Sequence, residues 1–183
     1  MKIFGFIGTG NMGGALAKAA SKVVSTDAML LSDGYAPVAE SLAKEFGCKA
    51  VAVNTVAVSA DLIWLGVKPQ VMGSMLSGIA PYLAARTTPF VLVSMAAGVS
   101  IADIQMMAGG NYPVIRIMPN TPVMVGEGMI LISSDPEKTD DAAEAAVVQF
   151  QEIMKGAGSF MSIPESSFDI TTSIRCTLSY CTH

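Results

Sequence analysis

The residues with the clearest chemical meaning stand near the start of the chain. Gly8-Thr9-Gly10-Asn11-Met12-Gly13 has the spacing G-x-G-x-x-G and directly follows an apolar run, Ile3 to Ile7, that predicts a strand. In this setting the first glycine permits a tight turn, Gly10 lets the backbone approach a pyrophosphate, and Gly13 lets helix and strand pack closely. The helix expected over Asn11 to Val24 offers N–H groups and a partial positive charge to phosphates. The motif predicts a dinucleotide site; the alternative is a glycine-rich turn that binds nothing.

An acidic residue follows the second predicted strand, Met29 to Ser32. Asp33 stands where a carboxylate usually holds the adenosine ribose, and an acid there favours NAD because it repels the 2′-phosphate of NADP. No Arg or Lys lies between Ser32 and Lys44 to receive that phosphate, but Ser32 and Asn54 could receive it as neutral donors. Asp33 could instead be the turn residue of an Asp-Gly pair. The choice between NAD and NADP stays open.

Small and polar residues follow four more predicted strands, at the edge where a parallel sheet binds its ligands. The strands are expected over Lys49 to Val53, Leu62 to Val67, Phe90 to Met95 and Pro113 to Ile117; the segments at their ends are Asn54-Thr55, Gly66-Val67-Lys68-Pro69-Gln70, Ala96-Ala97-Gly98 and Met118-Pro119-Asn120-Thr121-Pro122. Together they suggest a nicotinamide pocket with Lys68 and Asn120 as polar contacts and small residues on which a flat ring can lie. The alternatives are a solvated lysine at a strand end and a turn-forming asparagine between prolines.

These segments belong to a regular alternation of strands and helices. Further helices are expected over Pro37 to Phe46, from Pro69, over Ile101 to Ala108 and over Asp140 to Met154, with an antiparallel strand over Gly128 to Ser133 and an edge strand over Ser159 to Ser162. Such alternation builds βαβ units and a parallel sheet covered on both faces. The sequence predicts an α/β fold: a Rossmann-type doubly wound, mostly parallel sheet with antiparallel additions at the C-terminal side. The domain is expected over residues 1–163.

Composition excludes several classes of function. The net charge of −4 and the lack of a Lys/Arg cluster argue against a nucleic-acid partner. The only histidine is His183, so no His-based triad is expected, and Cys176, Cys181 and His183 lack a fourth metal ligand, so no metal is expected. Charged residues make up 14% of the chain, against roughly 25% in ordinary domains, which calls for a membrane or a partner. The longest uncharged stretch, Thr87 to Ala102, is too short to span a bilayer, so a cytoplasmic protein with a partner surface is favoured.

Several motifs, taken in order, resemble those of a known family. They are Phe6-Ile7-Gly8-Thr9-Gly10-Asn11-Met12-Gly13, Gly66-Val67-Lys68-Pro69-Gln70, Val93-Ser94-Met95-Ala96-Ala97-Gly98-Val99, Ile115-Arg116-Ile117-Met118-Pro119-Asn120-Thr121-Pro122 and Gly126-Glu127-Gly128. This series is similar to that of the pyrroline-5-carboxylate reductases, in order and spacing, from Lys2 to about Thr172. The resemblance implies NAD(P)H-dependent reduction of 1-pyrroline-5-carboxylate to L-proline, the last step of proline biosynthesis.

The resemblance also implies roles for individual residues. The residues expected to bind the cofactor, with NADP implied and NAD possible, are Gly8, Gly10, Asn11, Met12, Gly13, Ser32, Asp33, Asn54, Val67, Lys68, Pro69, Ala96, Ala97, Gly98 and Asn120. Asn120 and Thr121 are expected to contact the substrate, and Lys68 is the one candidate for a catalytic side chain. A cofactor that delivers hydride to an electrophilic C=N carbon needs few catalytic groups from the protein.

The end of the chain departs from the family pattern. In the family a Ser-Gly-x-Gly-Pro-Ala motif leads into long helices that form the dimer and complete the substrate site, whereas here Arg175 to His183 stands in its place. We expect residues 164–183 to be a remnant of the connection to that helical domain, aberrant from about residue 175 through truncation or a frameshift. Two alternatives follow: a fragment that binds cofactor without turnover, or a different NAD(P)-dependent reductase.

Overall fold

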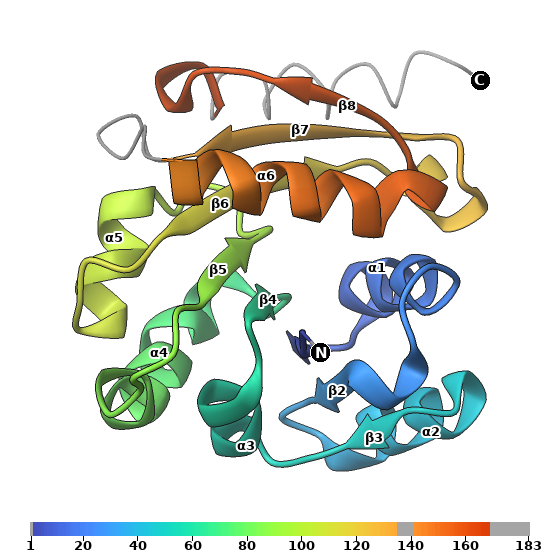
Figure 1. Cartoon of the computed structure of the whole chain (residues 1–183), viewed down its shortest axis with the longest axis horizontal. Coiled ribbons are helices and arrows are strands. Elements are labelled where there is room, and N and C mark those ends of the chain that lie inside the picture. Colours follow the sequence, from blue (N-terminus) through green and yellow to red (C-terminus); the bar gives the residue numbers. More distant parts are fainter. Residues whose placement is uncertain (1, 135–140, 169–183) are drawn as a thin grey trace.

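The computed structural model describes residues 2–134 and 141–168, with no description of the side chains of residues 141–143. An eight-stranded sheet forms its centre, in the order β3-β2-β1-β4-β5-β6-β7-β8 (Figure 1). The strands are β1 (Phe4–Ile7), β2 (Met29–Ser32), β3 (Lys49–Ala50), β4 (Leu62–Leu65), β5 (Val91–Ser94), β6 (Val114–Pro119), β7 (Gly128–Ser134) and β8 (Gly158–Ser162). Strands β3 to β6 are parallel, β7 is antiparallel to β6, and β8 runs parallel to β7. The predicted Rossmann-type sheet with antiparallel additions is confirmed.

Helices cover both faces of the sheet. They are α1 (Asn11–Ser21), α2 (Ala36–Phe46), α3 (Val53–Ser59), α4 (Pro69–Ala84), α5 (Ile101–Ala108) and α6 (Asp141–Met154), with short 3-10 turns η1 (Thr26–Ala28), η2 (Thr121–Val125) and η3 (Lys155–Ala157). Helices α1, α2 and α6 share one buried core with the sheet, and α3, α4 and α5 share the other. Because both of their faces are buried, the central strands β1, β2, β4 and β5 are almost continuously apolar rather than alternating. No helix of the described chain is long and apolar enough to cross a bilayer.

The aromatic residues of the central strands gather in one of these two cores. Trp64 of β4 is fully buried and stacks on Phe6 of β1, with ring centroids 4.5 Å apart. Phe4 and Phe150 meet the same indole, each at 6.3 Å. Aromatic pairs at such separations add to the stability that burial alone provides. Trp64 is the only tryptophan of the chain, so it reports on the state of the central strands.

The third predicted strand is the main error of the sequence interpretation. Lys49 to Val53 was expected to be extended, but β3 ends at Ala50 and helix α3 begins at Val53. The valines of this segment favour a strand by propensity, yet Val56 and Ala57 are completely buried on the inner side of a helix. Gly5 of β1 makes room for that helix, because a Cβ there would overlap the side chain of Val56. Packing on the sheet overrides the intrinsic preference of the valines.

The predicted domain boundary at residue 163 stays a prediction. Residues 165–168 form one helical turn after β8, and Phe168 is buried with only 1% of its surface exposed. The segment from residue 175, predicted to be aberrant, lies outside the described residues.

Candidate functional site

A cleft of about 880 Å³ opens at the carboxyl edge of the sheet, where the chain order reverses between β1 and β4. In doubly wound sheets this reversal is the usual ligand site. The β1–α1 turn, the end of β2, the β3–α3 connection and the start of α4 line the cleft. Six of the residues predicted to bind the cofactor line it together: Gly8, Gly10, Ser32, Asp33, Val67 and Lys68.

Close backbone packing builds the floor of this cleft. Gly8 has φ = +87°, a conformation that side chains disfavour, and a Cβ there would lie 2.6 Å from the Gly66 carbonyl carbon. A Cβ on Gly13 would overlap the carbonyl oxygen of Gly8. The start of α1 therefore lies against the ends of β1 and β4, as the motif predicts. Sequence analysis gave no role to Gly66, although a glycine directly after a buried strand is a signal for close backbone approach.

Helix α1 begins at the cleft, with its N-cap Gly10 in the lining. Gly10 is exposed, and apart from its chain neighbours no atom of the described chain lies within 4 Å of the place where a Cβ would stand. Within the described residues no side chain caps this helix, and its first turn contains no acid. The N–H groups of the first turn and the helix dipole could therefore bind an anion such as a phosphate.

The end of β2 is tied to the glycine turn. The N–H of Gly8 donates to the carbonyl oxygen of Ser32 at 2.8 Å, and Ser32 itself is buried. Asp33 Oδ2 accepts the backbone N–H of Thr9 at 2.7 Å and the Thr9 hydroxyl at 3.2 Å. Asp33 Oδ1 accepts the N–H of Tyr35 at 3.0 Å. Asp33 therefore joins two turns of the protein, a contact that spacing alone did not indicate.

Asn54 does not lie in a loop at the strand edge. It is the second residue of α3, its Oδ1 accepts the N–H of Thr55 at 2.9 Å, and it is absent from the lining of the cleft. The predicted loop position was wrong for the same reason as the third strand. Its neighbour Val53 lines the cleft instead.

Lys68 lines the cleft at the start of α4. It is the N-cap of α4, with extended backbone, and Pro69 takes the first helical position. Proline suits that position because it has no N–H to satisfy there and its φ is already helical. Lys68 is exposed and is the only cation among the described residues that line the cleft. Its ammonium group can reach toward the cleft from a fixed backbone position.

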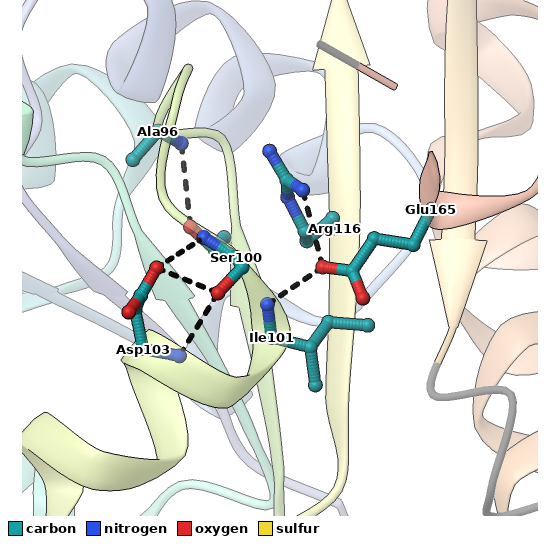
Figure 2. A network of polar contacts seen from close by, with 7 residues as sticks. Ala96, Ser100, Ile101, Asp103, Arg116 and Glu165 are labelled. Atoms are coloured by element: carbon teal, nitrogen blue, oxygen red, sulfur yellow. Dashed lines mark hydrogen bonds and ion pairs between the residues drawn. The ribbon is translucent and has the colours of Figure 1, made fainter. Parts of the chain in front are cut away.

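The Ala96-Ala97-Gly98 turn leads from β5 into α5, whose first turn is filled by carboxylates (Figure 2). Ser100 Oγ accepts the N–H of Asp103 at 3.1 Å, while Asp103 Oδ2 accepts the N–H of Ser100 at 3.1 Å and its hydroxyl at 2.6 Å. The hydrogen bond from the Ser100 side chain is the main reason that the pKa of Asp103 lies below its usual value. This reciprocal arrangement is a capping box.

A carboxylate from a distant segment completes the same helix terminus. Glu165 Oε1 accepts the N–H of Ile101 at 2.7 Å and pairs with an Arg116 guanidinium nitrogen at 3.1 Å (Figure 2). Arg116 of β6 is only 1% exposed, and its guanidinium lies 4.6 Å from the centroid of the Phe168 ring. Sequence analysis missed this cluster, because nothing in the spacing of an arginine and a glutamate 49 residues apart links them.

The two residues predicted to contact substrate lie at the end of β6. Asn120 Oδ1 accepts the N–H of Met129 at 2.9 Å, which ties the loop to β7. Thr121 is exposed and begins η2, which packs against α1 and β7. The carboxyl end of β6 thus lies beside the first helix, but neither residue lines the cleft.

The remaining predicted cofactor residues also lie outside the lining: Asn11, Met12, Gly13, Pro69, Ala96, Ala97 and Gly98. They belong to the first turns of α1 and α4 and to the β5–α5 turn. Their roles stay predictions.

Comparison with known proteins identifies the family of this chain and several similar proteins. Residues 3–98 match the family described as NADP oxidoreductase coenzyme F420-dependent. The chain is 30% identical to pyrroline-5-carboxylate reductase 3 of Mus musculus, over 93% of this chain and 60% of that protein, and 31% identical to the pyrroline-5-carboxylate reductase of Methanosarcina acetivorans, over 93% and 62%. The crystal structure of Plasmodium falciparum pyrroline carboxylate reductase with NADP bound superposes with a TM-score of 0.79 at 27% identity, covering 98% of this chain and 64% of that one. The motif resemblance is confirmed, and the chain spans about 60% of the length of these two curated relatives.

Proposed function

Because the chain belongs to the family described as NADP oxidoreductase coenzyme F420-dependent, and its relatives are pyrroline-5-carboxylate reductases, we propose that it supplies the cofactor-binding half of such a reductase. The reaction is the NADPH-dependent reduction of 1-pyrroline-5-carboxylate to L-proline. The observation that carries the proposal is the cleft at the reversal of chain order, whose lining includes Gly10, the N-cap of α1, at a helix start that no side chain of the described residues caps.

The residues of the chain bind and orient in this reaction. The first turn of α1 holds the pyrophosphate, and the Ala96-Ala97-Gly98 turn gives the nicotinamide ring a surface without long side chains. When bound, NADPH supplies the hydride that adds to the C=N carbon. Lys68 contributes positive charge at the cleft wall, and Asn120, with its Oδ1 engaged by Met129, keeps its amide N–H groups for a ligand. Positioning and the exclusion of water account for most of what the protein must do.

NADP is the cofactor we propose, in line with the family description and with the NADP bound to the Plasmodium relative. Ser32 lines the cleft at the end of β2, and we assign it as the neutral donor to the 2′-phosphate of NADP. A cytoplasmic location, and the homo-oligomeric assembly that the family resemblance implies, belong to the same proposal.

A second candidate is cofactor binding without turnover. The observation behind it is that the chain spans about 60% of the length of its curated relatives.

Two measurements separate these functions. Energy transfer from Trp64, the only tryptophan, to NADPH reports binding, and oxidation of NADPH followed with and without 1-pyrroline-5-carboxylate reports turnover. Binding with substrate-dependent oxidation supports the reductase, and binding without it supports the second candidate. Absence of binding at millimolar NADPH and NADH would refute both, and turnover only with another imine or a ketone would point to a different reductase.

A further inference from the structure

The carboxylate of Asp33 is already engaged by the protein. It accepts three hydrogen bonds, two from Thr9 and one from the N–H of Tyr35, at distances between 2.7 and 3.2 Å. Both oxygens take part, Oδ2 with the β1–α1 turn and Oδ1 with the residue that precedes α2. An acid that selects NAD must instead direct its oxygens at the ribose hydroxyls.

Thr9 is the residue on which this contact acts. It lies between Gly8 and Gly10, and only 2% of its surface is exposed. Its N–H donates to Asp33 Oδ2, so the peptide plane between Gly8 and Thr9 is fixed by this hydrogen bond. Hydrogen bonds to an ionised acceptor are stronger than neutral ones, so this plane is held more firmly than an ordinary turn.

The position of that plane decides how α1 meets a pyrophosphate. Gly10 follows directly and caps the helix, with no side chain of the described chain to hold it. Any rotation at Thr9 would therefore move the first N–H groups of α1 relative to the cleft. Since the pyrophosphate is common to NAD and NADP, a change at Asp33 acts on both cofactors alike.

From this geometry we propose that Asp33 is a positioning residue for the glycine turn and does not select between NAD and NADP. The proposal deepens the proposed function, on which its consequence for cofactor affinity rests. The acid after β2 is then not the ribose contact that selects NAD, because its oxygens accept hydrogen bonds from Thr9 and Tyr35.

Affinity measurements with both cofactors test the proposal. In Asp33→Asn and Asp33→Ala, we expect the Kd values for NADPH and NADH to rise together by about tenfold, the size typical of losing a hydrogen bond to a charged group. The ratio of the two Kd values should stay within about fivefold of the original. A ratio that shifts further toward NADPH, as removal of a ribose acid requires, would overturn the proposal, and so would unchanged affinity for both.

Two further variants sharpen this result. Thr9→Val removes the hydroxyl donor but keeps the backbone N–H, so both Kd values should rise by less than in Asp33→Ala. Glu45→Gln removes a carboxylate from α2 at a position that pairs with Lys18 outside the cleft, and it should leave both Kd values unchanged. A Thr9→Val effect confined to one cofactor would contradict a role in positioning.

A measurement without cofactor keeps this proposal separate from the proposed function. Amide hydrogen exchange in the free protein should show Thr9 protected in the original chain and at least about tenfold faster in Asp33→Ala. The amide of Trp64 in β4 serves as the folding control and should not change. Continued protection of Thr9 in a folded Asp33→Ala would overturn the positioning role, whereas failure of both cofactors to bind the original chain would refute only the proposed function.

Discussion

Helices α1 and α5 both begin at the carboxyl edge of the parallel strands, but their first turns are in opposite states. Gly10 starts α1 with no capping side chain from the described residues and an exposed position. Ser100 starts α5, and the carboxylates of Asp103 and Glu165 occupy its N–H groups. Both helices have the same dipole, so geometry alone does not make a phosphate site. The difference lies in whether the protein has supplied its own anions.

This contrast gives each terminus a separate role. Under the proposals above, the open turn of α1 keeps its N–H groups for a ligand and depends on Asp33 and close glycine packing for its position. The closed turn of α5 is a fixed structural element that holds the Ala96-Ala97-Gly98 turn beside the cleft edge. A binding terminus is left uncapped, which costs stability, whereas a structural terminus is capped.

The largest effect is expected on cofactor affinity, when an acidic side chain is introduced at the start of α1 like the one that α5 already has. Gly10→Asp is sterically tolerated, because Gly10 has extended backbone and open space at its Cβ position within the described structure. We expect the affinity for NADPH to fall by about 100-fold through repulsion and occupation of the N–H groups. Stability toward urea should stay equal or rise by about 0.3 kcal/mol, since Asp is a better N-cap than Gly. Gly10→Ala, which adds a Cβ without charge, is the control; equal losses in both variants would assign the effect to size.

The distant cap of α5 should contribute the next largest effect, this time on folding. Glu165→Ala removes one ion partner of the buried Arg116, and we expect the free energy of unfolding to fall by roughly 2 kcal/mol, the size of losing a hydrogen bond to a charged group. The Lys18–Glu45 pair has the same 3.1 Å separation but lies more than half exposed, so Glu45→Ala should cost less than about 1 kcal/mol. Urea titration of both variants gives the comparison. Equal costs would mean that burial at Arg116 does not strengthen the pair.

The local cap of α5 is expected to contribute less. Ser100→Ala removes the side-chain acceptor for the N–H of Asp103 and should lower the free energy of unfolding by about 1 kcal/mol. Ser77 is exposed within α4, so Ser77→Ala should change stability little. Chemical denaturation of the pair measures the difference, and a Ser100→Ala variant as stable as the original would show that the bonds from the backbone N–H groups of residues 100 and 101 are sufficient to hold the turn.

The smallest effect concerns pH. The pKa of Asp103 is lowered in the folded chain, first by the Ser100 side chain, below the unfolded value of about 3.9. Asp103 therefore stabilises the fold above that value, and the contribution is lost as pH falls through the lower, folded pKa. The stability difference between the original chain and Asp103→Asn should be constant above about pH 5 and shrink below pH 4. Urea midpoints across this range test the prediction. If the stability difference grew as the pH fell, the sign of the predicted effect would be wrong.

Patterns of residue type were sufficient for the sheet and for the floor of the cleft. The glycine motif and the apolar strands each act over a few residues, so their meaning could be predicted locally. Helix α3 could not, because its valines favour a strand and only Gly5, almost 50 residues earlier, creates the space that makes a helix pack there.

The polar contacts of the site were less predictable for a related reason. Asp33 was assigned by position alone, yet the direction of its oxygens depends on the backbone of Thr9, which the spacing does not specify. Arg116 and Glu165 meet only because β6 and the turn after β8 come together across β7. A motif specifies which residues reach an edge of the sheet, and the tertiary fold decides which partners they find.

The two sets of hydrogen bonds that cap α5 also form at different stages of folding. The Ser100–Asp103 bonds span three residues and can form as soon as the helix does, whereas the bond from Ile101 to Glu165 spans 64 residues. Closing the longer loop is slower and must wait for β6, β7 and β8 to assemble. The Ile101 amide is therefore the last of this turn to be shielded during synthesis or refolding. In pulsed hydrogen exchange, protection at Ile101 should appear after protection at Asp103, so that one helix terminus records both an early and a late step of folding.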